Sequence, residues 1–142
     1  MNLMPENRKR LIYIISNINN SLGFEWLAGS IDKNKFEVEY VFLNPDVPPL
    51  MKLFISRGYA TQFIKFDGKK DLPSVTFKLI RHFSKSKPDI VHGHLFEASL
   101  AGMAAAWFCR IPQRIYTRHH STLHHREHPS VVKYDKLINF FS

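Results

Sequence analysis

The sequence predicts an α/β fold in which helices cover both faces of a doubly wound, Rossmann-like parallel sheet. Five apolar segments rich in β-branched and aromatic residues alternate with five segments of helical periodicity, an order that is typical of such sheets. The first apolar segment, RLIYIIS at 10–16, is almost continuously apolar, as expected for a strand that is buried on both faces. The length of 142 residues fits a single domain, 1–142, with a core of its own.

The four further strands are predicted from their composition and from the turn-forming residues around them. They are FEVEYVFLN at 36–44, ATQFIKF at 60–66, DIVHGHLF at 89–96 and QRIYTRHH at 113–120. Valine, isoleucine, tyrosine and phenylalanine favour strands, and glycine, proline and asparagine mark the turns between them.

Five helices are predicted to connect and follow these strands, over 24–32, 49–58, 72–87, 97–110 and 129–142. Prolines precede the second helix and Gly58 ends it, while Pro88 ends the third, in agreement with the usual stop signals. Small residues in the fourth helix allow close packing on the sheet. Pro129 suits the first position of the last helix.

The surface charge is basic, because 20 lysines and arginines oppose 12 acidic residues and give a net charge of +8. Such a surface favours anionic partners, including nucleic acid, acidic lipid head groups and phosphorylated small molecules. The sequence carries no signature of a nucleic-acid-binding module, so nucleic acid is not predicted as a partner.

Cysteine usage and hydropathy indicate a cytoplasmic protein. Cys109 is the single cysteine, which rules out an internal disulfide and favours a reducing compartment. The apolar stretch Leu11–Ile15 is too short for a signal peptide, and no apolar run approaches the roughly 20 residues of a membrane span. Peripheral contact with the inner face of an acidic membrane remains open.

The loop SNINNSLG after the first strand is a candidate ligand loop. Gly23 would let a ligand approach the backbone closely, and the helix that follows would offer free N–H groups to an anion. The loop is neither a dinucleotide fingerprint nor a phosphate-binding Walker loop, because it has one glycine and no lysine. A plain turn is the alternative interpretation.

The fourth strand carries two histidines that point the same way, because they are two residues apart. His92 is expected deeper in the strand, as a hydrogen-bonded core residue. His94 is expected at the end of the strand, facing the crevice where ligands of parallel sheets bind. Glu97 is interpreted as a carboxylate at the start of the next helix.

The stretch RIYTRHHSTLHHREHPS contains five of the eight histidines. His119 is expected just past the fifth strand, at the same edge as His94, where imidazole could orient a hydroxyl group. His120, His124 and His128 are spaced for one face of a helix, which suggests a metal site. Pro129 disfavours helical geometry at the residue before it, and the neighbouring arginines oppose a cation. We therefore predict no metal here and favour a loop that lines the crevice.

Three blocks of the sequence resemble the N-terminal half of family 4 glycosyltransferases, which have the GT-B fold. These blocks are SLGFE after the first strand, KPDIVHGHLFEASLAG and IPQRIYTRHHST. The resemblance extends from about Arg10 to Phe141. The second and third blocks, in this order, are fairly specific for the family, and the first block is the weaker signal. The family often has a glycine pair where this chain has Leu22 and Gly23.

The resemblance implies a retaining transfer of a sugar from a nucleotide-sugar donor to a glycan or lipid-linked acceptor, as in cell-envelope polysaccharide synthesis. The transfer would need no metal and no cofactor. His119 matches the histidine placed against the transferred sugar, and Gly23 matches a glycine near the donor phosphates. His94 matches a histidine of the cleft, and His120 and His124 would line the acceptor side.

The resemblance also implies a second, C-terminal domain that holds most of the donor and is absent from this sequence. The chain is therefore expected to be inactive alone. Two other classes stay open: a non-catalytic module that binds an acceptor or an anionic lipid, and a metal-binding protein that uses the histidine-rich loop. An apolar face on the last helix, expected to be partly exposed, would agree with a missing partner.

Overall fold

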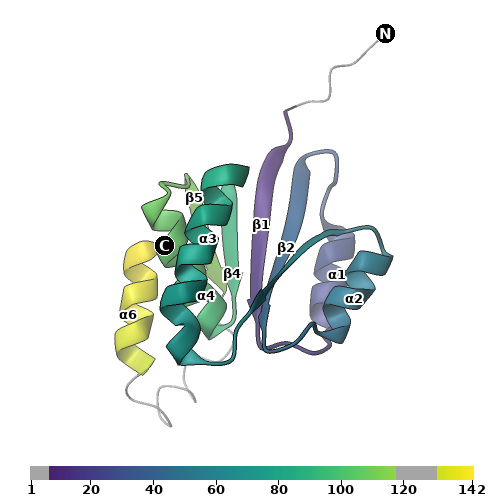
Figure 1. The fold of residues 1–142 in the computed structure, drawn as a ribbon. Coiled ribbons are helices and arrows are strands. Elements are labelled where there is room, and N and C mark those ends of the chain that lie inside the picture. The colour runs from purple at the N-terminus through teal and green to yellow at the C-terminus, as the bar shows by residue number, and fades with distance from the viewer. Residues whose placement is uncertain (1–6, 118–130) are drawn as a thin grey trace.

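A computed structural model describes residues 7–117 and 131–142. Its centre is a five-stranded sheet in the order β3-β2-β1-β4-β5 (Figure 1). Every neighbouring pair of strands is parallel. The strands are β1 (Lys9–Ser16), β2 (Phe36–Asn44), β3 (Ala60–Lys65), β4 (Ile90–His94) and β5 (Gln113–Thr117). The predicted doubly wound parallel sheet is confirmed.

Helices cover both faces of this sheet, with α1 and α2 on one face and α3, α4 and α6 on the other (Figure 1). Their bounds are α1 (Leu22–Ser30), α2 (Pro49–Ser56), α3 (Leu72–Ser86), α4 (Phe96–Phe108) and α6 (Val131–Phe141). A short 3₁₀ turn, η1 (Lys69–Asp71), leads into α3 and was not predicted. Among the described helices, none is long and apolar enough to cross a membrane.

The core consists of two apolar clusters, one on each face of the sheet, and β1 contributes side chains to both. Ile12 and Ile14 belong to the apolar cluster beneath α3 and α4. Tyr13 and Ile15 belong to the cluster beneath α1 and α2. Alternate residues of a strand point to opposite faces, so the continuous apolar run of the first strand supplies both clusters.

The predicted ends of the elements needed small corrections. The fourth strand was predicted over 89–96 and ends at His94, because α4 begins at Phe96. The fifth was predicted to reach residue 120; the described part of β5 runs from Gln113 to Thr117, and 118–130 lie outside the described residues. The described part of the last helix begins at Val131.

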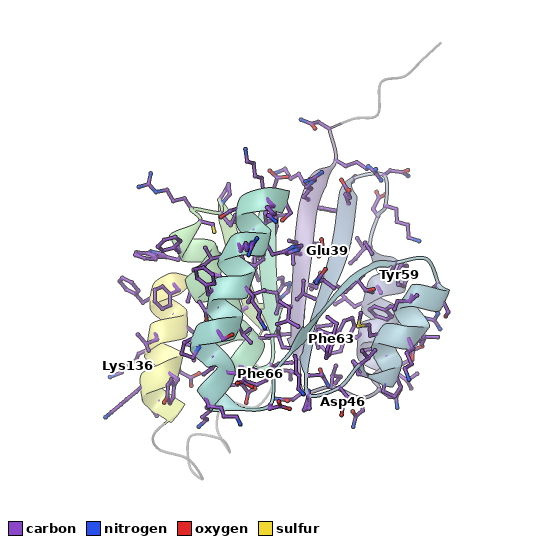
Figure 2. The ribbon with its side chains drawn as sticks, in the orientation of Figure 1. Glu39, Asp46, Tyr59, Phe63, Phe66 and Lys136 are labelled. Atoms are coloured by element: carbon purple, nitrogen blue, oxygen red, sulfur yellow. The ribbon has the colours of Figure 1, made fainter. Side chains whose placement is uncertain are left out.

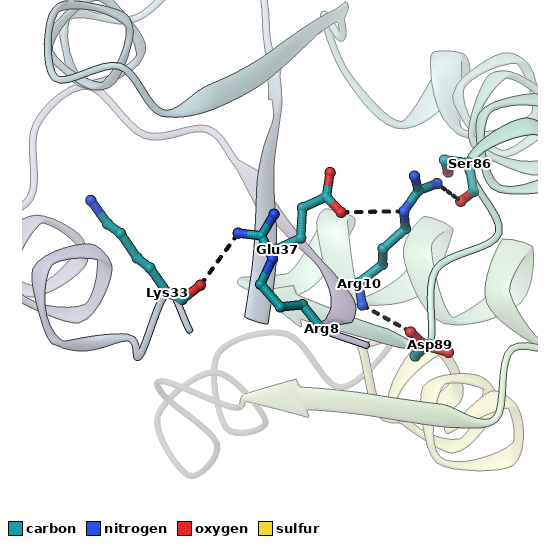
Figure 3. A network of polar contacts seen from close by, with 6 residues as sticks. All are labelled: Arg8, Arg10, Lys33, Glu37, Ser86 and Asp89. Atoms are coloured by element: carbon teal, nitrogen blue, oxygen red, sulfur yellow. Dashed lines mark hydrogen bonds and ion pairs between the residues drawn. The ribbon is translucent and has the colours of Figure 1, made fainter. Parts of the chain in front are cut away.

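A polar network at the amino edge of the sheet involves Arg10 of β1 and Arg8, which lies just before β1 (Figure 3). The Arg8 guanidinium donates to the carbonyl of Lys33 at 3.4 Å. The backbone N–H of Arg10 donates to Asp89 Oδ2 at 2.8 Å, and its guanidinium donates to the carbonyl of Ser86. Arg10 Nε also lies 3.6 Å from Glu37 Oε2. These contacts fasten β1 to β2 and to the end of α3.

Candidate functional site

Three strands end in buried polar residues at the carboxyl edge of the sheet, which is where ligands of open α/β sheets bind. Ser16, Asn44 and His94 are the last residues of β1, β2 and β4. Their exposed fractions are 0%, 5% and 5%. Buried polar groups are stable only when they are hydrogen-bonded, and the bonds of Ser16 and Asn44 fix the loops of this edge.

Asn44 fixes the loop between β1 and α1. Its Nδ2 donates to the carbonyl of Ile18 at 2.8 Å, and the backbone N–H of Ile18 donates to Asn44 Oδ1 at 3.4 Å. Asn17 enters this loop with φ of 50°, a left-handed conformation that asparagine tolerates better than most residues. The loop therefore has a defined path from the edge of the sheet to α1.

Gly23 is the second residue of α1, which differs slightly from the prediction that it precedes the helix. Ser21 caps α1, and its Oγ accepts from the backbone N–H of Phe24 at 3.4 Å. A Cβ atom on Gly23 would meet only Ser21 Oγ, at 3.6 Å, which is an ordinary contact. The fold itself therefore does not require glycine here, and the exposed first turn of α1 leaves room for a group from outside.

His94 lies at the end of β4 as predicted, but its ring is covered and does not face an open crevice. The ring of Phe24 stands edge-on to it at a centroid distance of 5.1 Å. On its other sides are His92, stacked at 4.1 Å, and Tyr13 at 5.2 Å. Phe24 follows Gly23 directly, so the structure brings the start of α1 and His94 together.

His92 forms the hydrogen bond that was predicted for it. Its Nε2 lies 2.7 Å from Thr117 Oγ1, at the end of β5. The ring of Tyr13 lies over both histidines, and burial raises the pKa of the Tyr13 hydroxyl. His92 thus links β4 to the last residue of β5.

The start of α4 is tied to the same edge. Ser16 Oγ accepts from the backbone N–H of Ala98 at 3.1 Å and donates to Glu97 Oε2 at 3.5 Å. Glu97 lies in the first turn of α4, which confirms its interpretation as a helix-start carboxylate. Leu95 joins β4 to α4 with φ of 72°, a costly conformation for a residue with a side chain, of a kind that clusters at functional sites.

His119, His120 and His124 lie outside the described residues. The last described residue before them is Thr117, which pairs with His94 in the register of β4 and β5. Thr117 therefore lies at the same edge as Gly23 and His94. Within the described ranges, no group of three or more histidine, cysteine or acidic side chains could hold a metal ion.

The match to a family model decides the assignment of the chain. The model of Glycosyltransferase Family 4 matches residues 27–141. The chain belongs to this family. No curated protein matches the sequence.

Solved structures share the fold of this family 4 chain. The UDP-GlcNAc 2-epimerase from Neisseria meningitidis, solved bound to UDP-GlcNAc, has a TM-score of 0.58 and 14% identity over 94% of this chain and 39% of its own. MurG from Acinetobacter baumannii has a TM-score of 0.61 and 14% identity over 91% and 39%. The UDP-GlcNAc 2-epimerase from Methanocaldococcus jannaschii has a TM-score of 0.57 and 16% identity over 94% and 37%. The chain thus spans under two fifths of these proteins, and they share its GT-B-like fold.

Sequence reasoning missed two residues that build this edge, Ser16 and Asn44. Both end strands that were predicted correctly, so their position at the edge was already visible in the sequence. Their burial and their bonds to Ala98 and Ile18 depend on contacts across 82 and 26 residues, which no local pattern indicates.

Proposed function

We propose that this chain is the acceptor-side domain of a retaining glycosyltransferase that moves a sugar from a nucleotide-sugar donor to a glycan or lipid-linked acceptor. The observation that carries the proposal is the family 4 match over 27–141, on a parallel sheet whose carboxyl edge is built from buried polar residues. A cytoplasmic enzyme at the inner face of a membrane would meet both kinds of substrate.

The proposal gives each candidate residue a role at the carboxyl edge of the sheet. The exposed first turn of α1 at Gly23 would face the phosphates of the donor, because N–H groups at a helix start favour an anion. His94 would hold Phe24 and the start of α1 in place from beneath. His119 would hydrogen-bond the transferred sugar, while His120 and His124 would contact the acceptor.

The test compares His119→Ala with His124→Ala in a two-domain form of the enzyme that includes this chain. A hydrogen bond that forms mainly in the transition state typically contributes on the order of 10²–10³ in rate. We expect His119→Ala to lower kcat by about this factor, whereas His124→Ala should mainly raise KM.

Melting temperatures of both variants provide the control, because a residue that only supports the fold would change stability and leave the kcat of folded enzyme alone. Equal kcat values for the two variants would contradict the role of His119. Transfer that persists in excess chelator would support the metal-independent reaction. A metal-dependent rate, together with zinc binding that His120→Ala abolishes, would instead favour the metal-binding alternative.

A further inference from the structure

Four aromatic side chains gather where α4 and α6 end. The ring of Trp107 lies 6.0 Å from that of Phe140 and 5.5 Å from that of Phe141, and these two phenylalanine rings are 5.3 Å apart. Phe108 follows Trp107 directly. Trp107, Phe108 and Phe140 are 45%, 64% and 68% exposed. We call these four residues the aromatic patch. Single exposed apolar residues are common, whereas a contiguous group marks an interaction surface.

The helices around the aromatic patch carry exposed cations and almost no acidic side chains. The exposed cations of this layer are Lys78, Arg81, Lys85, Arg110, Lys133 and Lys136. Within the described residues, none of them forms an ion pair. The acidic residues of α3, α4 and α6 are Glu97, which contacts Ser16 at the carboxyl edge, and Asp135, which is 9% exposed.

The helical layer on the opposite face of the sheet, α1 and α2, contains an ion pair between its two helices. There, Arg57 pairs with Glu25 at 3.2 Å between α2 and α1. The uncompensated positive charge is thus a property of the layer with the aromatic patch. Lys136 belongs to this layer, on α6 (Figure 2).

We infer that the aromatic patch and its surrounding cations form a docking surface for an anionic lipid bilayer. Tryptophan and phenylalanine side chains insert at the level of the lipid head groups, and lysine and arginine side chains bind lipid phosphates. The inference deepens the proposed function, since an enzyme with a lipid-linked acceptor works at a membrane. Vesicle binding needs neither donor nor acceptor, so its failure and the failure of the proposed function are separate results.

Two other occupants fit the observations less well. A second copy docked through the same face would place its exposed cations against those of the first. Single-stranded nucleic acid stacks its bases on flat aromatic faces, but the rings of Trp107, Phe140 and Phe141 meet one another at 44°, 59° and 73°. Such mutually inclined rings do not form a common stacking platform.

The two tryptophans provide a matched pair of reporters. Trp26 lies on α1, on the opposite helical layer, and is 73% exposed. In Trp26→Phe the fluorescence comes from Trp107, and in Trp107→Phe it comes from Trp26. We expect vesicles of phosphatidylcholine with about a third phosphatidylglycerol to shift the emission of Trp107 to shorter wavelength and to leave Trp26 unchanged. Pure phosphatidylcholine vesicles should shift neither.

Vesicle co-sedimentation measures the contribution of the cations. We expect each removed charge to weaken binding roughly fivefold, so Lys133→Gln with Lys136→Gln should weaken it about 25-fold. Lys52→Gln, on α2, is the control that removes a single positive charge from the opposite helical layer, and it should leave binding unchanged rather than weaken it roughly fivefold. Phe108→Ser with Phe140→Ser removes two exposed rings and should weaken binding more than tenfold, with melting temperatures confirming that each variant is folded.

Three results would overturn the inference. The first is an absence of binding to anionic vesicles, or equal binding to neutral ones. The second is an equal loss in the Lys52→Gln control. The third is a shift of Trp107 emission without lipid. If the shift accompanies dimerisation, detected by analytical sedimentation, the aromatic patch binds a second copy of the chain instead. If it appears on addition of single-stranded RNA, the aromatic patch binds nucleic acid instead.

Discussion

The tyrosine stack beneath α1 and α2 shows how single residues determine the response of the fold to pH. Tyr13 and Tyr40 stack with ring centroids 5.6 Å apart and are 6% and 3% exposed. Burial raises the pKa of both hydroxyls, and for Tyr40 the charges that Tyr13 and Tyr59 acquire when they ionise raise it further. The neutral tyrosine is therefore favoured in the folded state.

The first prediction concerns this stack. A raised folded-state pKa contributes stability that is fully present below the unfolded pKa of about 10 and is lost as the pH rises above it. We expect the free energy of unfolding to fall by up to about 1.4 kcal/mol per pH unit for each such tyrosine. Tyr40→Phe should reduce this slope, as measured by urea unfolding at about pH 8 and about pH 11. Tyr134→Phe, on α6, is the control, and an unchanged slope in Tyr40→Phe would contradict the prediction.

Individual residues were predictable from the sequence where a strand fixes their direction. The spacing of His92 and His94 placed both rings on one face, and they stack on each other at 4.1 Å. The burial of His94 was not predictable, because it depends on Phe24, which reaches it from another helix.

At the scale of elements, the contact between α4 and β4 requires a glycine. A Cβ atom on Gly93 would lie 2.8 Å from Ser99 Cα, a backbone atom that cannot move away without shifting α4. By contrast, the first turn of α1 has space at Gly23. Packing therefore requires glycine at position 93 but not at position 23, although both residues lie at the carboxyl edge.

The second prediction uses this difference. Gly93→Ala should destabilise the fold by about 1–3 kcal/mol, the usual cost of overpacking. Gly23→Ala should stabilise it by about 0.4–1 kcal/mol, because alanine restricts the unfolded chain and fits the helix. Urea unfolding of both variants is the measurement. Equal destabilisation by the two substitutions would show that Gly23 is needed for folding, which would remove the argument for ligand access at this position.

The helices and strands themselves were predictable because their apolar patterns agreed with the turn-forming residues that flank them. β2 has the predicted bounds, since turn formers flank a strongly β-prone run. The last helix was expected to expose part of an apolar face that includes Leu137 and Ile138, and Leu137 is 45% exposed. Ile138, placed on the same face in that expectation, is 2% exposed, because it packs into the cluster beneath α3 and α4. Helical periodicity gives the faces of a helix but not the neighbour that each face meets.

At the scale of the whole molecule, the chain has an ordered carboxyl edge and a cation-rich helical layer with an aromatic patch at the ends of α4 and α6. The structures that share its fold are more than twice as long, since the chain covers 37% to 39% of them. The family and the fold class could be predicted from ordered sequence blocks. The cation-rich layer could not, because it combines residues of α3, α4 and α6 that no single stretch brings together.

The last prediction concerns the isolated chain. In the proposed enzyme the donor is held mainly by a second domain, and catalysis depends on placing donor and acceptor against each other, which alone can contribute about 7–11 kcal/mol to lowering the barrier. We therefore expect the purified chain to show no sugar transfer from a panel of nucleotide sugars to lipid-linked or glycan acceptors, measured with radiolabelled donors. The two-domain form supplies the positive control under the same conditions. If the isolated, contaminant-free chain turned over, the acceptor-side assignment would be wrong, because a domain that only holds the acceptor lacks the groups that position the donor.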